Sequence, residues 1–114
     1  MSDERRRSER KRLRRVIKAV GLTFETDTVE GKGQVRSLSM VGMLIVCSAP
    51  PETGELVRVL FDDLEGNEIE LCGTVMSTRA RQGQLGEDEA GFFMRVDADI
   101  DAFLAFYEQV LTAR

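Results

Sequence analysis

Two groups of residues in this sequence have types and spacings suited to binding a ligand. Residues 37–42 form a turn-like segment that carries two hydroxyl side chains and ends at a glycine. Such a turn can present small polar groups and bare backbone to a ligand, because glycine tolerates close approaches that other residues resist. The second group is the arginine-rich N-terminus, where Arg6, Arg10 and Arg14 recur at intervals of four. Arginine pairs bidentately with phosphate and stacks on bases, so two of these arginines could hold an anionic nucleotide.

Catalytic chemistry has little support in the sequence. The chain has no histidine, no GxxxxGKS/T phosphate loop, no GxSxG nucleophile motif and no acidic cluster with a convincing metal-ligand spacing. Ser37 and Ser39 would need a general base to act as nucleophiles, and none is identifiable. The acidic groups at residues 62–63 and 87–89 stand in glycine-flanked segments, which is typical of solvated turns. We therefore expect no enzyme activity, no metal site and no cofactor.

The charge of the chain is unevenly distributed. The net charge is −4, but residues 1–18 hold nine basic and three acidic side chains, a balance of +6 that leaves −10 on residues 19–114. A basic arm on an acidic body attracts a compact anion and repels long polyanions. We expect residues 1–15 to be a flexible arm and residues 16–114 a single domain. Without a secretory signal or an apolar run of about 20 residues, a cytoplasmic protein with no membrane insertion is expected.

Short apolar segments separated by turn-forming residues predict strands. Residues 25–33 are polar and contain two glycines, and we interpret them as a hairpin loop. Gly73 predicts a bulge. Cys47 and Cys72 lie in predicted strands and are interpreted as small buried apolar residues, with a pairing across strands as the alternative. The predicted strands are residues 16–24, 34–38, 43–47, 56–61, 68–76 and 92–96.

A change of period near the C-terminus predicts one helix at about residues 99–112. Asp97 or Asp99 could cap its start. The apolar residues of its predicted core-facing side are Ile100, Phe103, Leu104, Tyr107 and Leu111. Six short strands followed by one helix predict a mainly β fold, a six-stranded antiparallel β-barrel covered by a C-terminal α-helix.

These motifs, taken in order, resemble a known family. Arg-x-x-x-Arg ahead of the first strand, then a turn close to Asp/Asn-x-Ser-x-x-Gly at the start of an apolar strand, is similar to the two-part signature of bacterial PilZ domains. The second half reads SLSMVG at residues 37–42. The resemblance extends over nearly the whole chain, because PilZ domains are six-stranded antiparallel barrels that usually end in a helix. The segment GFFMRV at residues 91–96 is similar to the last strand of the family.

PilZ domains bind cyclic di-GMP, a bacterial second messenger with two guanines and two phosphates. The resemblance implies that the arginines wrap the phosphates and stack on guanine, while the turn reads guanine edges. It matches Ser39 and Gly42 to the serine and glycine of the family, and Ser37 to a position usually held by Asp or Asn. A hydroxyl lacks the charge and second acceptor oxygen of a carboxylate. We expect this difference to cost ~1–2 kcal/mol of binding free energy, which is roughly tenfold in affinity.

The register of the arginine pair follows from the strand after it. If Arg10 were the second arginine, the following segment would be too charged for a barrel strand. Val16 opens the alternating pattern directly after Arg14 or Arg15. We therefore favour Arg10 and Arg14 as the nucleotide-binding pair, with Arg6 and Arg15 as less certain contributors.

Three functions compete. The first is a cyclic di-GMP receptor whose basic arm orders over the ligand and transmits binding to an unidentified partner protein. The second is a PilZ-like adaptor of motility or pilus machinery that acts by protein–protein interaction without nucleotide, and Ser37 favours it. The third is a nucleic-acid binder that uses the basic arm. We rank it last, because no aromatic residues are interleaved with the arginines and the body of the chain is acidic.

Overall fold

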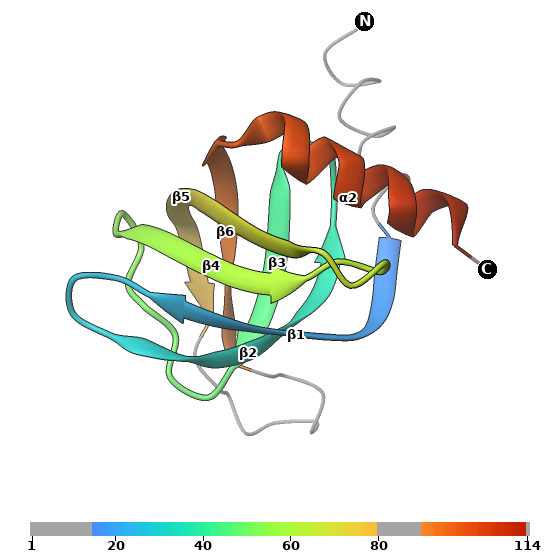
Figure 1. Cartoon of the computed structure of the whole chain (residues 1–114). Helices are drawn as coiled ribbons and strands as arrows, with labels where there is room; N and C mark the ends of the chain where they lie inside the picture. Colours follow the sequence, from blue (N-terminus) through green and yellow to red (C-terminus); the bar gives the residue numbers. More distant parts are fainter. Residues whose placement is uncertain (1–14, 80–89, 114) are drawn as a thin grey trace, which may run out of the picture.

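The computed structural model describes residues 15–79 and 90–113. Within them, six antiparallel strands close into a barrel with the neighbour order β1-β2-β3-β6-β5-β4, and one helix, α2, follows (Figure 1). The elements are β1 Arg15–Glu25, β2 Glu30–Leu38, β3 Gly42–Cys47, β4 Leu56–Asp62, β5 Glu68–Arg79, β6 Gly91–Ala98 and α2 Ile100–Thr112. The predicted fold class, a six-stranded antiparallel barrel with a C-terminal helix, is confirmed.

The alternation of side chains along the strands builds the core. In β4, Val57, Val59 and Phe61 are buried and the residues between them are exposed. This is the period-two pattern of a strand with one face on the core and the other on solvent. Burial of an apolar side chain of this size contributes ~1.5–3 kcal/mol. The inward rows of the strands therefore account for much of the stability of the barrel.

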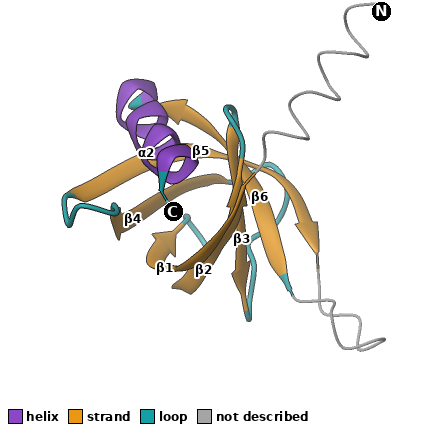
Figure 2. Ribbon diagram, turned by 90° about the vertical axis from the view of Figure 1, so that its right-hand side faces the viewer, coloured by secondary structure: helices purple, strands orange, loops and turns teal. Residues whose placement is uncertain are grey.

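Helix α2 lies across one end of the barrel (Figures 1 and 2). Its buried face consists of Phe103, Phe106, Tyr107 and Val110, spaced as one side of a helix. The ring of Phe106 lies 4.8 Å from that of Phe61, centroid to centroid, in a tilted arrangement. The helix therefore closes the apolar interior at this end.

Polar contacts tie α2 to the β4–β5 hairpin. Gln109 Nε2 donates to Asp63 Oδ2 at 3.0 Å, and Gln109 Oε1 accepts a hydrogen bond from Leu64 N at 3.0 Å. Asp63 Oδ1 accepts from the backbone N–H groups of Glu65 and Asn67, each at 2.9 Å. Desolvation acts to raise the pKa of Asp63, but the hydrogen bonds from Asn67, Gln109 and Glu65 outweigh it, so the pKa lies below its ordinary value. One carboxylate thus organises the turn and holds the helix.

The loop of residues 48–55 covers the opposite end of the barrel. Pro51 is fully buried, and its carbonyl accepts a hydrogen bond from Thr78 Oγ1 at 2.7 Å. Val75 N donates to Glu55 O at 2.9 Å, which fixes the end of the loop against β5. The chain itself therefore covers both ends of the barrel, and a ligand site is expected on the outer surface.

The prediction of a loop over residues 25–33 is wrong. Strands β1 and β2 pair as far as Glu25 and Glu30, so the turn is much shorter. Gly33 lies inside β2, where an added Cβ would stand 2.6 Å from Val46 O. This glycine permits close strand pairing and does not form a turn.

The predicted bounds of the helix are close to those observed, but its predicted buried face is partly wrong. Ile100 and Leu104 are 47% and 37% exposed, whereas Phe106 and Val110 are buried. Asp99 occupies the N-cap position, but it has a left-handed φ of 60° and makes no side-chain cap hydrogen bond. The sequence pattern identified the helix and missed its rotation against the barrel.

The two cysteines differ from their predicted state. Cys47 and Cys72 are free thiols, so the alternative of a pairing across strands is wrong, and both are half-buried rather than fully buried. Burial raises the pKa of the Cys47 thiol, against a smaller opposite effect of a backbone hydrogen bond at Ala49. The bulge expected at Gly73 is confirmed by a register shift between Cys72 and Gly73.

Candidate functional site

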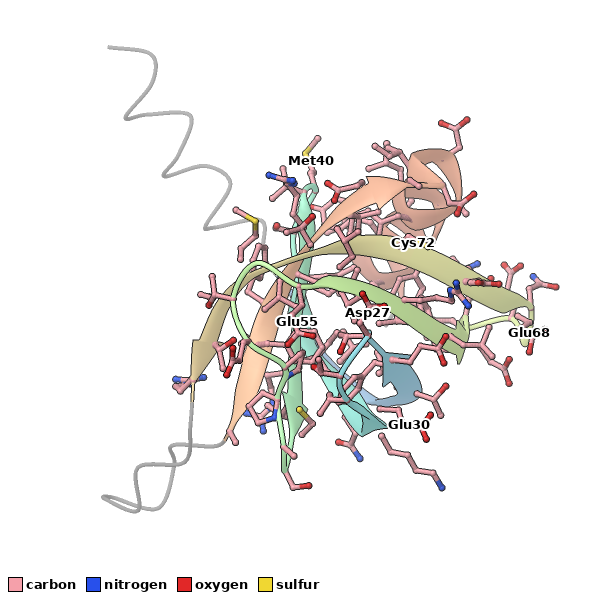
Figure 3. The ribbon with its side chains drawn as sticks, turned by 90° about the vertical axis from the view of Figure 1, so that its left-hand side faces the viewer. Asp27, Glu30, Met40, Glu55, Glu68 and Cys72 are labelled. Carbon is pink, nitrogen blue, oxygen red and sulfur yellow. The ribbon has the colours of Figure 1, made fainter. Side chains whose placement is uncertain are left out.

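Two hydrogen bonds of Ser39 stabilise the turn between β2 and β3. Ser39 N donates to Gly42 O at 2.9 Å, and Ser39 Oγ accepts a hydrogen bond from Val41 N at 3.4 Å. Met40 and Val41 form the tip and are 48% and 43% exposed. Figure 3 shows Met40 projecting away from the barrel at this tip. The turn therefore has an exposed apolar tip, Met40 and Val41, next to the buried Ser37 and Ser39.

Ser37 lies on the outer side of the barrel because of a bulge in β2. Val35 pairs with Ile45, but Ser37 pairs with Leu44, so one extra residue, Arg36, is inserted between them. Ile45 is completely buried and Leu44 is half-buried, which assigns Leu44 and its partner Ser37 to the outer face. The bulge therefore shifts the alternation of inward-facing and outward-facing residues in β2 just before the turn.

The Ser37 hydroxyl is an unusual group for an outer face. The residue is only 3% exposed. Its Oγ is buried and has no hydrogen-bond partner in the part of the chain that the structure describes. A buried hydroxyl without a partner costs free energy, because it has lost its hydrogen bonds to water. Such an atom is a candidate contact for a ligand.

Gly42 is required where β3 passes close to β6. An added Cβ at this position would stand 2.0 Å from Met94 O and 2.9 Å from Phe93 Cζ. The first contact is with backbone, which cannot move aside without disturbing the strand pairing. The strand packing alone therefore requires glycine at position 42, whether or not Gly42 contacts a ligand.

The segments that form the turn and the strands beside it contain no acidic residues as far as Asp97, which pairs with Arg95 near the end of β6. Residues 31–51 and 90–96 contain no aspartate or glutamate. They form most of β2, the turn, β3 and most of β6, which are neighbours in the barrel. Arg36 and Arg95 lie in these segments. This face suits an anionic ligand, and the absence of acidic residues from these two segments is a sequence signal that our motif analysis did not use.

The opposite side, made of β1, β4 and β5, is acidic. A surface hollow of about 430 Å³ there is lined by Glu25, Glu30 and Glu70, together with Lys32 and Arg58 among others. Arg58 pairs with Glu25 at 3.1 Å and with Glu70 at 3.3 Å. Figure 3 shows acidic side chains of this side, including Glu30, well away from the turn tip. Its carboxylates would repel a nucleotide, so we do not assign the ligand to this hollow.

Strand pairing brings the start of β1 to the turn. Arg15 pairs with Leu38, and Val16 pairs with Ser37. The predicted ligands Arg6, Arg10 and Arg14 lie outside the described residues, as does the side chain of Arg15. Of the predicted site residues, the structure therefore brings together Ser37, Ser39, Gly42 and the backbone of Arg15.

Two residues that the motif analysis missed flank Gly42 on the outer face of β6. Phe93 pairs with Leu44, and Arg95 pairs with Gly42. Arg95 Nε donates to Asp97 Oδ1 at 2.7 Å. This hydrogen bond, together with one from Thr74, lowers the pKa of Asp97. The cross-strand pairs cannot be read from the sequence without the register.

Comparison with known proteins identifies the family of the chain. The family model of the PilZ domain matches residues 4–107. The chain belongs to the PilZ domain family. The match includes both the arginine-rich segment and the 37–42 turn, and PilZ domains are in general receptors for cyclic di-GMP and adaptor modules, not typically enzymes. No curated protein has a significant sequence match to the chain.

Two solved PilZ structures share the fold. The Bacillus subtilis inhibitor of motility, MotI/DgrA, has a TM-score of 0.63 and 15% sequence identity, over 89% of this chain and 51% of that protein. The PilZ domain of CeSA from a cellulose-synthesizing bacterium has a TM-score of 0.60 and 18% identity, over 85% and 93% of the two chains. The chain thus spans about half the length of the first of these proteins. In the described residues of this PilZ chain, no helix is long and apolar enough to cross a membrane.

Proposed function

We propose that the chain is a cyclic di-GMP receptor module that passes nucleotide binding to a partner protein. Arg10 and Arg14 bind the phosphates and stack on guanine, and Ser37, Ser39 and Gly42 contact the guanine edges. Arg6 and Arg15 contribute further positive charge. Ordering of the basic arm over the ligand creates the surface that the partner recognises.

The observation that carries this proposal is the Ser37 hydroxyl. It is buried, it has no partner among the described residues, and it stands beside a turn whose flanking segments, residues 31–51 and 90–96, contain no acidic residues. A hydrogen bond from a guanine edge would satisfy it. Because the atom is covered in this conformation, binding requires a local rearrangement that uncovers it.

The basic arm can transmit nucleotide binding only if its contacts with the ligand offset the entropy lost when the arm becomes ordered. Ordering a segment costs ~1–2 kcal/mol per residue in backbone entropy. Only charge-assisted hydrogen bonds, which are roughly twice as strong as neutral ones, can offset such a cost over a few residues. The arginines at the end of the arm supply these bonds.

Calorimetry with cyclic di-GMP tests the proposal. Wild-type protein is expected to bind, and the Arg10→Ala/Arg14→Ala variant is expected to lose most of its affinity. The control is Arg7→Ala/Arg12→Ala, which removes the same charge from the same segment and keeps the proposed pair. Absence of binding by the wild type, or an equal effect of the two double variants, contradicts the proposal.

A second candidate function is a nucleotide-independent adaptor, and Ser37 favours it as well. The residue is a neutral, covered hydroxyl where PilZ domains usually have Asp or Asn. One structural neighbour is named as an inhibitor of motility, so a motility or pilus component is a reasonable class of partner. Co-purification of a stable partner from cells without cyclic di-GMP supports the adaptor, and an interaction that requires the nucleotide supports the receptor.

A further inference from the structure

Strand β6 places two side chains next to the turn on the outer face of the barrel. Phe92 and Met94 are 1% and 0% exposed and point into the core, so Phe93 and Arg95 alternate to the outside. Phe93 pairs with Leu44 and Arg95 pairs with Gly42. Both outer residues therefore flank the glycine that ends the turn.

The tip of the Phe93 ring lies against Gly42. The position of a Cβ at Gly42 lies 2.9 Å from Phe93 Cζ, so the ring fills the space that a side chain would take. Phe93 is half-buried, and its partner Leu44 is half-buried as well. Leu44 also pairs with Ser37 on its other side. Ser37, Leu44 and Phe93 thus form one row across three strands, which spans roughly 10 Å at the usual strand spacing.

Arg95 is held in place by its neighbours. Its Nε donates to Asp97 Oδ1 at 2.7 Å, and its Nη2 lies 3.5 Å from Thr74 Oγ1. Thr74 Oγ1 in turn donates to Asp97 Oδ2 at 2.6 Å. The Arg95 side chain is still 50% exposed. A guanidinium fixed on one side and open on the other loses little entropy when it binds an acceptor.

We infer that the outer face of β6 is a third wall of the nucleotide site, in which Phe93 packs against a guanine and Arg95 donates hydrogen bonds to the edge of that base. This rests on the proposed function. Phe93 is a half-buried aromatic side chain beside the turn, and stacking of a base on an aromatic side chain contributes ~1–3 kcal/mol. Arg95 stands two residues along the same face, so it is nearest to the edge of a base lying on Phe93. The O6 and N7 atoms of guanine are two acceptors that suit an arginine fork.

The test compares matched variants by calorimetry with cyclic di-GMP. Arg95→Gln is expected to weaken binding about tenfold, and Phe93→Leu, which keeps the apolar volume, to weaken it about fivefold or more. Arg58→Gln is the control for the charge, because Arg58 is also half-exposed and paired with carboxylates, but lies on the acidic side. It is expected to change the affinity less than twofold. Arg95→Gln should also reduce the preference for cyclic di-GMP over cyclic di-AMP.

A measurement on the unmutated protein keeps the inference testable if a variant folds poorly. With labelled phenylalanine, NMR should detect nuclear Overhauser effects between the Phe93 ring and the guanine H8 proton. Wild-type binding without these signals, with unchanged affinity in Arg95→Gln and Phe93→Leu, overturns the inference and leaves the proposed function standing. Absence of wild-type binding overturns both.

Discussion

The Ser37 hydroxyl allows a test at the scale of one residue. Ser37→Asp restores the carboxylate usual in PilZ domains and is expected to tighten cyclic di-GMP binding by roughly tenfold. The same change buries a charge at a position that is 3% exposed, so it should lower the stability of the free protein by ~1–3 kcal/mol. Thermal unfolding with and without the nucleotide measures both effects.

The control for this change is Ser37→Ala. It removes a buried hydroxyl that has no partner within residues 15–79 and 90–113, so the stability of the free protein should stay the same or rise by up to ~1 kcal/mol. A marked loss of stability in Ser37→Ala would mean that the hydroxyl has a structural role. A Ser37→Asp variant that binds no better than the wild type would count against a direct contact with the nucleotide.

Gly42 provides a second test of a single residue. Gly42→Ala places a methyl group 2.0 Å from Met94 O, so β3 and β6 must separate locally. We expect a loss of ~1–3 kcal/mol in the free energy of unfolding, measured by urea denaturation. Gly21→Ala is the matched control, because its nearest neighbour, Gly33 O, would be 3.9 Å away. That variant should be neutral or slightly more stable.

At the scale of elements, the contact between α2 and the β4–β5 hairpin predicts how firmly the helix is held. Gln109→Ala removes two hydrogen bonds, to Asp63 and to Leu64 N. The expected loss is ~1–2 kcal/mol of unfolding free energy. Glu108→Ala changes the neighbouring exposed position and should have little effect. Hydrogen exchange should show faster opening of α2 in Gln109→Ala only, and equal exchange in the two variants would contradict this role.

Two hydrogen-bonded carboxylates, Asp63 at the α2 contact and Asp97 beside Arg95, predict a dependence of stability on pH. The folded pKa values of Asp63 and Asp97 lie below their ordinary values, so the ionised forms stabilise the folded chain. Their contribution is fully present above the ordinary pKa and is lost as the pH falls through the lower folded pKa. The melting temperature should therefore decline below about pH 4. Asp63→Asn should show a smaller acid-induced decline than the wild type, and an equal decline would exclude Asp63 as a contributor.

The strands could be predicted because their period is local, whereas the buried face of the helix could not. The predicted and the observed buried faces share Phe103 and Tyr107. The prediction added Ile100, Leu104 and Leu111, whereas the helix buries Phe106 and Val110. The choice between them depends on where the barrel opens, for example on the position of Phe61 beneath Phe106. This information is not present in the helix segment itself.

The candidate site, like the fold, could be predicted only in part from the sequence. The turn with Ser37, Ser39 and Gly42 could be identified because hydroxyls and glycine have local turn preferences. The burial of Ser37 could not be foreseen, since it depends on the bulge at Arg36 and on pairing with Leu44. The role of β6 beside the turn also depends on register, because Phe93 is far from Gly42 in the sequence.

At the scale of the molecule, the separation of charge predicts which polyanions are rejected. Residues 19–114 carry a charge of −10, and among the described residues Glu25, Glu30 and Glu70 line the β1–β4–β5 side. Cyclic di-GMP is small enough to lie beside the turn, where the flanking segments lack acidic residues, but a long nucleic acid would also meet the acidic side. We expect no retention of DNA or RNA at physiological salt. Tight, steeply salt-dependent retention would instead support the nucleic-acid function.

The close approach of strands at Gly42 has a consequence for the evolution of the family. Selection for the barrel alone is enough to keep glycine at this position, because any side chain would meet Met94 O. A descendant that abandoned its messenger would therefore retain the glycine while drifting at positions such as Ser37. In surveys of PilZ genes, the glycine should mark inheritance of the fold, and the first position of the motif should indicate whether the messenger is still bound.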